Sequence, residues 1–141
     1  MFHHQQKLRV DRNETVKLVQ RVLEGEQCQN GEVNIVFVDD KMITELNTEY
    51  LNHHYTTDVL SFRLSEENEK KLDGEVYVNV SQAKRQATEY RVAVKNEIGR
   101  LVIHGTLHLL GYEDNTPGKK RRMSKKEDFY LGNSGLEYFH A

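Results

Sequence analysis

Hydrophobic and polar residues alternate along the first third of the chain with two different periods. Residues 13–25 and residues 41–51 carry apolar side chains at the spacing of a helix with one buried face. Between them, residues 32–38 are rich in β-branched side chains and have the length of a strand. The side chains expected to cap the two helices at their N-termini are Asn13 and either Asp39 or Asp40.

Two more strand-like runs and two more helical stretches follow. Residues 59–64 and 74–80 have strand patterns and are joined by a charged connection, which predicts an antiparallel hairpin. A helix is expected from 82 to 92 behind the capping residue Ser81. A second and more apolar helix is expected over residues 95–110.

The order of these elements predicts an α+β fold, in which helices pack on a small mixed sheet of about four strands. Strands and helices do not alternate strictly, as they would in a doubly wound parallel sheet. The stretch KKRRMSKKEDFYL at 119–131 is expected to be a last helix or a frayed tail. No repeat or low-complexity linker interrupts the pattern, so residues 1–141 are expected to form a single domain.

Composition and charge exclude several function classes. The chain lacks an apolar run near the ~20 residues of a membrane helix, and its N-terminus lacks the apolar stretch of a secretory signal. The single cysteine, Cys28, fits a reducing compartment, so a cytoplasmic protein is expected. A net charge of −2 argues against a broadly electrostatic nucleic-acid binder. The local basic cluster at 119–126 is either a route for an RNA strand or a solvated helix face balanced by Glu127 and Asp128.

Candidate chemistry is concentrated in the segment HGTLHLLGYED. His104 and His108 are four positions apart and would project from the same face of a helix, where two imidazoles can bind one metal ion. Gly111 follows where a helix can end on a left-handed glycine, and the chain reversal would bring Glu113 or Asp114 back towards the imidazoles. Asp114 occupies the third-ligand position of a His-x3-His-x2-Gly-x2-ligand pattern. The pattern therefore predicts His104, His108 and Asp114 as metal ligands, at the end of one helix.

A plainer interpretation stays open at this point. Two histidines at this spacing occur by chance, Gly111 can be an ordinary helix end, and Asp114 can belong to a turn. Against it, both imidazoles lie within the apolar stretch RLVIHGTLHLLG. Burying them there costs free energy unless they find partners, and a metal ion is an efficient shared partner.

The segment HGTLHLLGY resembles the signature of the YbeY family, the metal-dependent, single-strand-specific endoribonucleases of bacterial ribosomal RNA maturation. A second block, LN…Y at 46–50 with TDVLSF at 57–62, is similar to another segment of that family. The GEV sequence at 74–76 and Glu97 also fall where the family has similar residues. The resemblance covers roughly residues 33–130 in the family's order.

The chain departs from the family pattern at two positions. Asp114 stands where the family's third metal ligand is usually histidine. Zinc remains the expected ion, although a carboxylate ligand leaves manganese or magnesium less excluded. Leu51 stands where the family commonly has an arginine that is thought to engage the substrate phosphate. Arg63, or alternatively His53 and His54, could supply that charge as a substrate-binding group.

The resemblance implies a metal-dependent endoribonuclease that acts in ribosome biogenesis, on ribosomal RNA at the 3′ end of 16S rRNA. It further implies one divalent ion, zinc, and the small ribosomal subunit as partner, with no DNA partner and no membrane. Two alternatives remain: a zinc metalloprotease-like hydrolase, and a non-catalytic ribosome-assembly factor with a structural metal.

The residue that would act as general base is not apparent from the sequence. Gly105 occupies the position that carries the glutamate in His-Glu-x-x-His peptidases, which argues against the peptidase alternative. Glu113 would serve as a base only if it turned inward. Asp58 is expected to lie in a turn or to orient a ligating imidazole.

Overall fold

The computed structural model describes residues 11–66 and 71–132, and this part of the chain contains one mixed sheet. Its strands are β1 (Gly31–Val38), β2 (Val59–Arg63) and β3 (Leu72–Asn79), in the order β1-β3-β2. β1 runs parallel to β3, whereas β2 runs antiparallel to β3. The expected pairing of the two later strands is therefore confirmed, and the middle of their connection lies outside the described residues.

The sheet has one strand fewer than the expected about four. The hydrophobic pattern locates three strand-like runs, and each of them is a strand in the structure. Within the described ranges, the rest of the chain is helical or forms connecting loops, so no further segment there pairs with the sheet.

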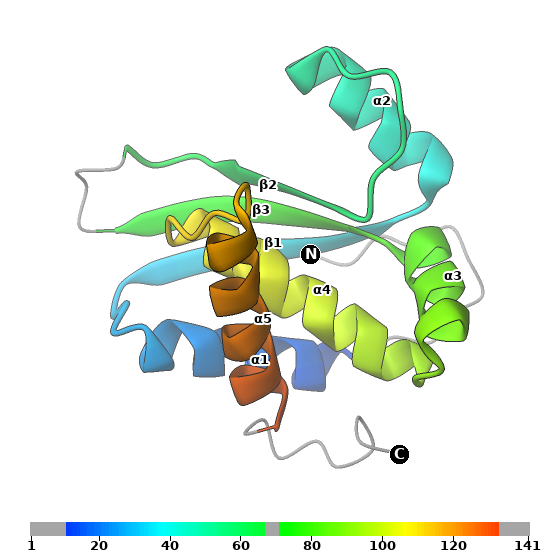
Figure 1. The fold of residues 1–141 in the computed structure, drawn as a ribbon. Coiled ribbons are helices and arrows are strands. Elements are labelled where there is room, and N and C mark those ends of the chain that lie inside the picture. Colours follow the sequence, from blue (N-terminus) through cyan, green and yellow to red (C-terminus); the bar gives the residue numbers. More distant parts are fainter. Residues whose placement is uncertain (1–10, 67–70, 133–141) are drawn as a thin grey trace.

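Five helices in the described residues surround the sheet, and they cover its two faces unequally (Figure 1). They are α1 (Arg12–Gly25), α2 (Asp40–Leu51), α3 (Val80–Tyr90), α4 (Val94–Leu109) and α5 (Pro117–Gly132). α4 packs on β2 and β3 and contacts α1, α3 and α5, whereas α2 lies on the opposite face. The basic stretch near the C-terminus is thus a helix rather than a frayed tail. In the described part of the chain, every helix is too short or too polar to cross a bilayer.

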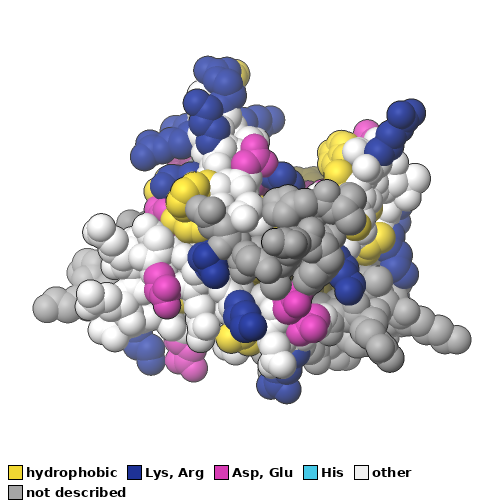
Figure 2. All heavy atoms as spheres, turned by 90° about the horizontal axis from the view of Figure 1, so that it is seen from below, with side chains coloured by type: hydrophobic (Ala, Val, Ile, Leu, Met, Phe, Trp, Pro, Cys, Tyr) yellow, Lys and Arg dark blue, Asp and Glu magenta, His cyan; other side chains and the backbone are white. Residues whose placement is uncertain are grey.

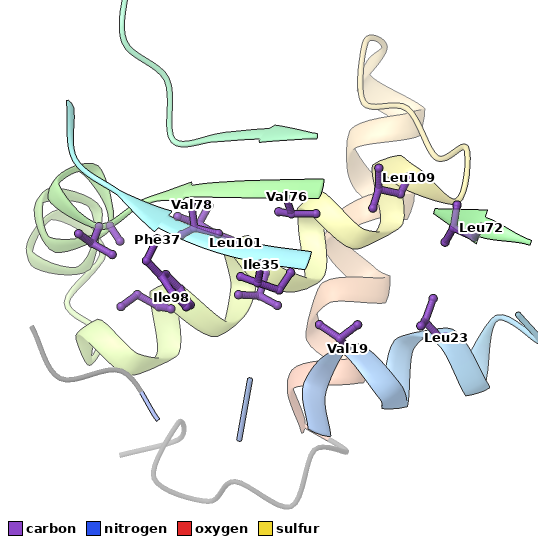
Figure 3. Packing of buried hydrophobic residues seen from close by; sticks show 13 residues of the cluster. Val19, Leu23, Ile35, Phe37, Leu72, Val76, Val78, Ile98, Leu101 and Leu109 are labelled. Atoms are coloured by element: carbon purple, nitrogen blue, oxygen red, sulfur yellow. The ribbon is translucent and has the colours of Figure 1, made fainter. Parts of the chain in front are cut away.

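The main core lies between the sheet and helices α1 and α4 (Figure 3). Alternate residues of β1 serve two cores: Ile35 and Phe37 pack towards α1 and α4. Val36 and Val38 pack with Ile43 of α2 on the other face. Because the second half of β1 is buried on both faces, residues 35–38 form a continuous apolar run instead of an alternating one.

In two helices, α1 and α3, a side chain other than the expected one forms the N-cap, and each helix begins earlier than the sequence predicts. Asp11, not Asn13, accepts a backbone N–H of the first turn of α1 at 3.0 Å. Asn79, not Ser81, caps α3 and is fully buried at the end of β3. Asp39 caps α2, which settles the alternative left open between two neighbouring aspartates.

Candidate metal centre

The central helix α4 carries both predicted histidines on one face, close to its C-terminus. His104 Nε2 lies 3.0 Å from His108 Nε2, and the two side chains are 20% and 29% exposed. Gly111 follows the helix with a φ of 102°, the left-handed conformation expected at this helix end. The chain reverses its direction there.

Asp114 returns to the two imidazoles, as the spacing predicts. Its Oδ2 atom lies 3.4 Å from His104 Nε2 and 3.7 Å from His108 Nε2. The point in the plane of these three atoms that is equidistant from them lies about 2.0 Å from each, the length of zinc bonds to imidazole nitrogen and carboxylate oxygen. The donor set therefore fits one divalent ion, and three protein ligands leave a coordination position open for water or substrate.

Each imidazole is held by a further partner through its Nδ1 atom. His108 Nδ1 lies 2.9 Å from the carbonyl oxygen of Tyr112. His104 Nδ1 lies 2.6 Å from Oε2 of Glu127 on α5. Because both partners accept hydrogen bonds, Nδ1 of each neutral imidazole donates and Nε2 keeps its lone pair, which is the arrangement that metal-binding histidines require.

Glu127 is the residue of this centre that sequence reasoning missed. Its side chain is 8% exposed and also accepts a hydrogen bond from Arg100 at 3.1 Å. Burial works to lower the pKa of His104, but the hydrogen bond and negative charge of Glu127, together with the charges of Asp114 and Asp58, outweigh it and raise this pKa. The only signal in the sequence is the position of Glu127 at helical spacing between the apolar residues Met123 and Tyr130.

A cavity of about 580 Å³ lies over the candidate ligands, between β2 and the turn after α4. Arg63 at the end of β2 lines this cavity together with the three ligands. Its guanidinium donates to the carbonyl oxygens of Leu109 and Glu66 and to Ser65 Oγ, each at 3.3 Å. A guanidinium has five N–H donors, so Arg63 retains donors for a bound phosphate.

Neither the position of the missing family arginine nor the two alternative histidines lines this cavity. Leu51 is an exposed residue at the end of α2. His53 is exposed and stacks on Tyr55 with ring centroids 5.2 Å apart. Neither His53 nor His54 belongs to the cavity wall, so Arg63 is the predicted substrate-binding cation that the structure brings next to the ligands.

Two acidic residues other than Asp114 line the same cavity. Glu113 is exposed and pairs with Lys119 at 2.9 Å, so its carboxylate does not turn inward. Asp58 lies ahead of β2, and its carboxylate has no ion pair within the described ranges. The role expected for Asp58, orienting a ligating imidazole, is filled by Glu127.

The basic cluster at 119–126 lies on the outer surface of α5, beside the candidate centre. Figure 2 shows Lys and Arg side chains crowded on a projection at the upper left of that view. Some of these cations already have partners within the protein. Lys126 forms an ion pair with Glu26 at 2.9 Å, and both Arg122 and Lys126 lie over the Tyr112 ring. Another cation of the cluster, Lys120, is exposed and lines a cavity together with His104 and Asp114.

Comparison with known proteins finds one family along nearly the whole chain. The family model described as Endoribonuclease YbeY matches residues 1–135. A Chloroherpeton thalassium protein named Endoribonuclease YbeY is 40% identical over 115 residues, which cover 82% of this chain and 80% of the relative. A Syntrophus aciditrophicus protein of the same name is 37% identical over 137 residues, covering 92% and 86%. A solution structure of a Thermotoga maritima protein superposes with a TM-score of 0.65 at 27% identity, covering 98% of this chain and 91% of that one.

Proposed function

Because the chain belongs to the YbeY family of endoribonucleases, we propose that its metal centre hydrolyses single-stranded ribosomal RNA. Endoribonucleases are hydrolytic enzymes, and we assign their reaction to this metal centre. The observation that carries it is the convergence of His104, His108 and Asp114 on one point, with donor atoms within 4.8 Å of one another. The substrate we propose is the 3′ end of 16S rRNA during maturation of the small ribosomal subunit, in the cytoplasm.

The three ligands would hold a zinc ion through two imidazole nitrogens and one carboxylate oxygen. A bound zinc ion supplies positive charge beside the phosphate and lowers the pKa of a bound water. Glu127 and the Tyr112 carbonyl fix the two rings so that their Nε2 atoms face the same point. Preorganised ligands of this kind need little rearrangement when an ion binds.

Two residues of the cavity wall have roles next to the ligands in this proposal. Arg63 binds the phosphate and stabilises the negative charge that develops during attack. Asp58 accepts the proton of the attacking water, because Glu113 is paired with Lys119 and Asp114 faces the imidazoles. Both side chains line the cavity that contains the ligands.

The peptidase alternative has a specific obstacle in α4. The position that carries the catalytic glutamate of His-Glu-x-x-His enzymes is Gly105, which packs against the sheet. A Cβ atom there would collide with Val76, and the Gly105 carbonyl accepts a hydrogen bond from Ser61 at 2.9 Å. This position therefore faces the core, and a peptidase would need a base from elsewhere.

The decisive experiment measures metal content and substrate choice together. Zinc-reconstituted protein should hold one ion per chain and should cleave single-stranded RNA in preference to duplex RNA and to peptides. His104→Ala should lose both the ion and the cleavage. Lys17→Gln, a change at an exposed residue of α1, is the matched control and should keep both.

Three results would contradict the proposal. Zinc-reconstituted wild-type protein without a stoichiometric ion would show that these residues do not form a metal centre. Cleavage of peptides but not RNA would favour the peptidase. Association with small subunits that survives His108→Ala, with no metal-dependent RNA cleavage above background, would favour an assembly factor with a structural metal.

A further inference from the structure

A second cavity of about 250 Å³ lies on the other side of His104, between α3, α4 and α5. Three residues line both this cavity and the one over the ligands: Asp58, His104 and Asp114. The two cavities are therefore neighbours that share the wall formed by the candidate centre. If one phosphate of an RNA strand lies over the ligands, the adjoining nucleotide of that RNA is within reach of the second cavity.

One side of this second cavity offers an aromatic ring. Tyr90, the last residue of α3, lines the cavity and is 57% exposed. An exposed tyrosine ring beside a nucleic-acid site provides a surface on which an unpaired base can stack. Stacking of this kind is tolerant of sequence, since every base has a flat face.

The deeper wall of the cavity is rich in hydrogen-bond acceptors. Glu97 is 3% exposed and accepts a hydrogen bond from Gln86 at 2.7 Å. Glu127 is bonded to His104 and Arg100, so its charge is largely compensated. Carboxylates in the interior disfavour a phosphate there but can accept hydrogen bonds from the amino groups of bases. This wall therefore fits a base better than a phosphate.

The rim of the cavity carries a cation. Lys120 lies in the first turn of α5, is exposed and lines the cavity. Its ammonium group has no ion-pair or hydrogen-bond partner within residues 11–66 and 71–132. A phosphate held at the rim would meet this charge without entering the acidic interior.

We propose that this second cavity binds one unpaired nucleotide of the RNA strand, next to the phosphate that is cleaved. Its base stacks on Tyr90, and its phosphate pairs with Lys120. The inference rests on the proposed function and adds a physical reason for single-strand preference. A base inside a duplex is stacked on both faces and must be extruded before it can enter such a cavity.

A cleavage assay on a randomised single-stranded RNA pool tests this subsite, with zinc-loaded full-length protein. Sequencing the products gives the base preference at each position around the cut. Tyr90→Ala should lower kcat/KM by about fivefold or more and flatten the preference at one position adjacent to the cut, whereas Tyr90→Phe should retain both.

The lysine is tested through the salt dependence of RNA binding. Lys120→Gln should weaken binding and lower the slope of log affinity against log salt by about 0.7, as expected for one lost contact to a single strand. Lys17→Gln on α1 removes a charge of the same kind from an exposed residue that does not line the cavity, and it should leave the slope unchanged.

The outcomes separate this inference from the function on which it rests. If wild type cleaves RNA but Tyr90→Ala keeps its efficiency and base preference at every position, the subsite is wrong and the nuclease assignment stands. An unchanged salt slope in Lys120→Gln would likewise rule out the proposed contact between Lys120 and the phosphate. If wild type does not cleave RNA, the proposed function itself is wrong.

Discussion

His104 and Glu127 are joined by a contact of 2.6 Å between Nδ1 and Oε2, although they are 23 positions apart in the sequence. The contact connects α4 to α5, so the orientation of a candidate ligand depends on the packing of the last described helix. Glu127 is 8% exposed and also bonded to Arg100, which fixes its own position. The centre therefore has a support that its local sequence motif does not contain.

Removing this support should weaken metal binding without removing a ligand. Glu127→Ala is expected to lower zinc affinity by about 10- to 100-fold, because His104 loses the acceptor that orients its ring. A competition titration against a coloured zinc chelator measures the change. Asp128→Asn is the control, since Asp128 also pairs with Arg100 but does not touch His104. Equal affinities in Glu127→Ala and wild type would show that α5 does not support the centre.

The third ligand can be tested by exchanging its chemistry. Asp114→Ala should strongly reduce zinc affinity, because two imidazoles alone leave the ion underliganded. Asp114→His should retain binding, since it restores a third donor of the type that zinc accepts. Isothermal titration with zinc measures both variants. If Asp114→Ala binds zinc like wild type, then Glu113 or water is the third partner.

Gly105 lets α4 approach the sheet closely beside the centre. A Cβ atom there would collide with Val76 and lie 3.1 Å from Ser61 Oγ and from Val59 Cγ2. Gly105→Ala is therefore expected to lower the free energy of unfolding by about 1–3 kcal/mol, despite the better helix propensity of alanine. Urea denaturation of the two proteins measures the difference.

Gly118 provides the matched substitution on another helix. The nearest atom to a Cβ there is at the end of the Arg121 side chain, 3.8 Å away. Gly118→Ala should thus be neutral or stabilise the protein by up to about 1 kcal/mol. A similar loss of stability in both variants would mean that packing against the sheet is not the cause.

Glu26 ties α1 to the turn that follows the metal helix. Tyr112 donates to its Oε1 atom at 2.5 Å, and Tyr130 and Lys126 donate to Oε2. Burial works to raise the pKa of Glu26, but the hydrogen bonds from the two tyrosines and Lys126 outweigh it and lower this pKa. The carboxylate form therefore stabilises the folded state.

The sign of this shift fixes the pH dependence. A carboxyl group whose pKa is lowered on folding contributes stability above its ordinary value of 4.5, and this stability is lost as the pH falls through the folded pKa. Glu26→Gln should lower the free energy of unfolding by about 1–3 kcal/mol at pH 7, with the deficit shrinking below pH 4.5. Denaturant titrations across this range measure it. Glu24→Gln, at an exposed neighbour on α1, should show no such trend.

The local part of the centre could be predicted because its geometry is set by nearby residues. Four positions bring His104 and His108 to the same face of a helix in any amphipathic context. Gly111 adopts the conformation that few other residues adopt, and the reversal delivers Asp114. These relationships depend on helix geometry alone.

The remaining features depend on contacts between distant segments. Glu127 lies 23 residues from His104, and no spacing rule connects positions that far apart. Asn79 caps α3 in place of Ser81 because it is also buried against α2, where its amide donates to Asp40 at 2.7 Å. Such a choice between two neighbouring polar residues is made by tertiary packing, which propensity does not contain.

All three candidate ligands come from the short stretch between His104 and Asp114, so a bound ion closes only a small ring of chain. Chelation should therefore release the end of α4 and its turn, and leave the three strands as they were. In hydrogen-exchange terms, removing the ion should speed amide exchange around Gly111 while the rates in β1 and β3 stay constant. The ion would then govern the order of one corner of the protein rather than the survival of the whole fold.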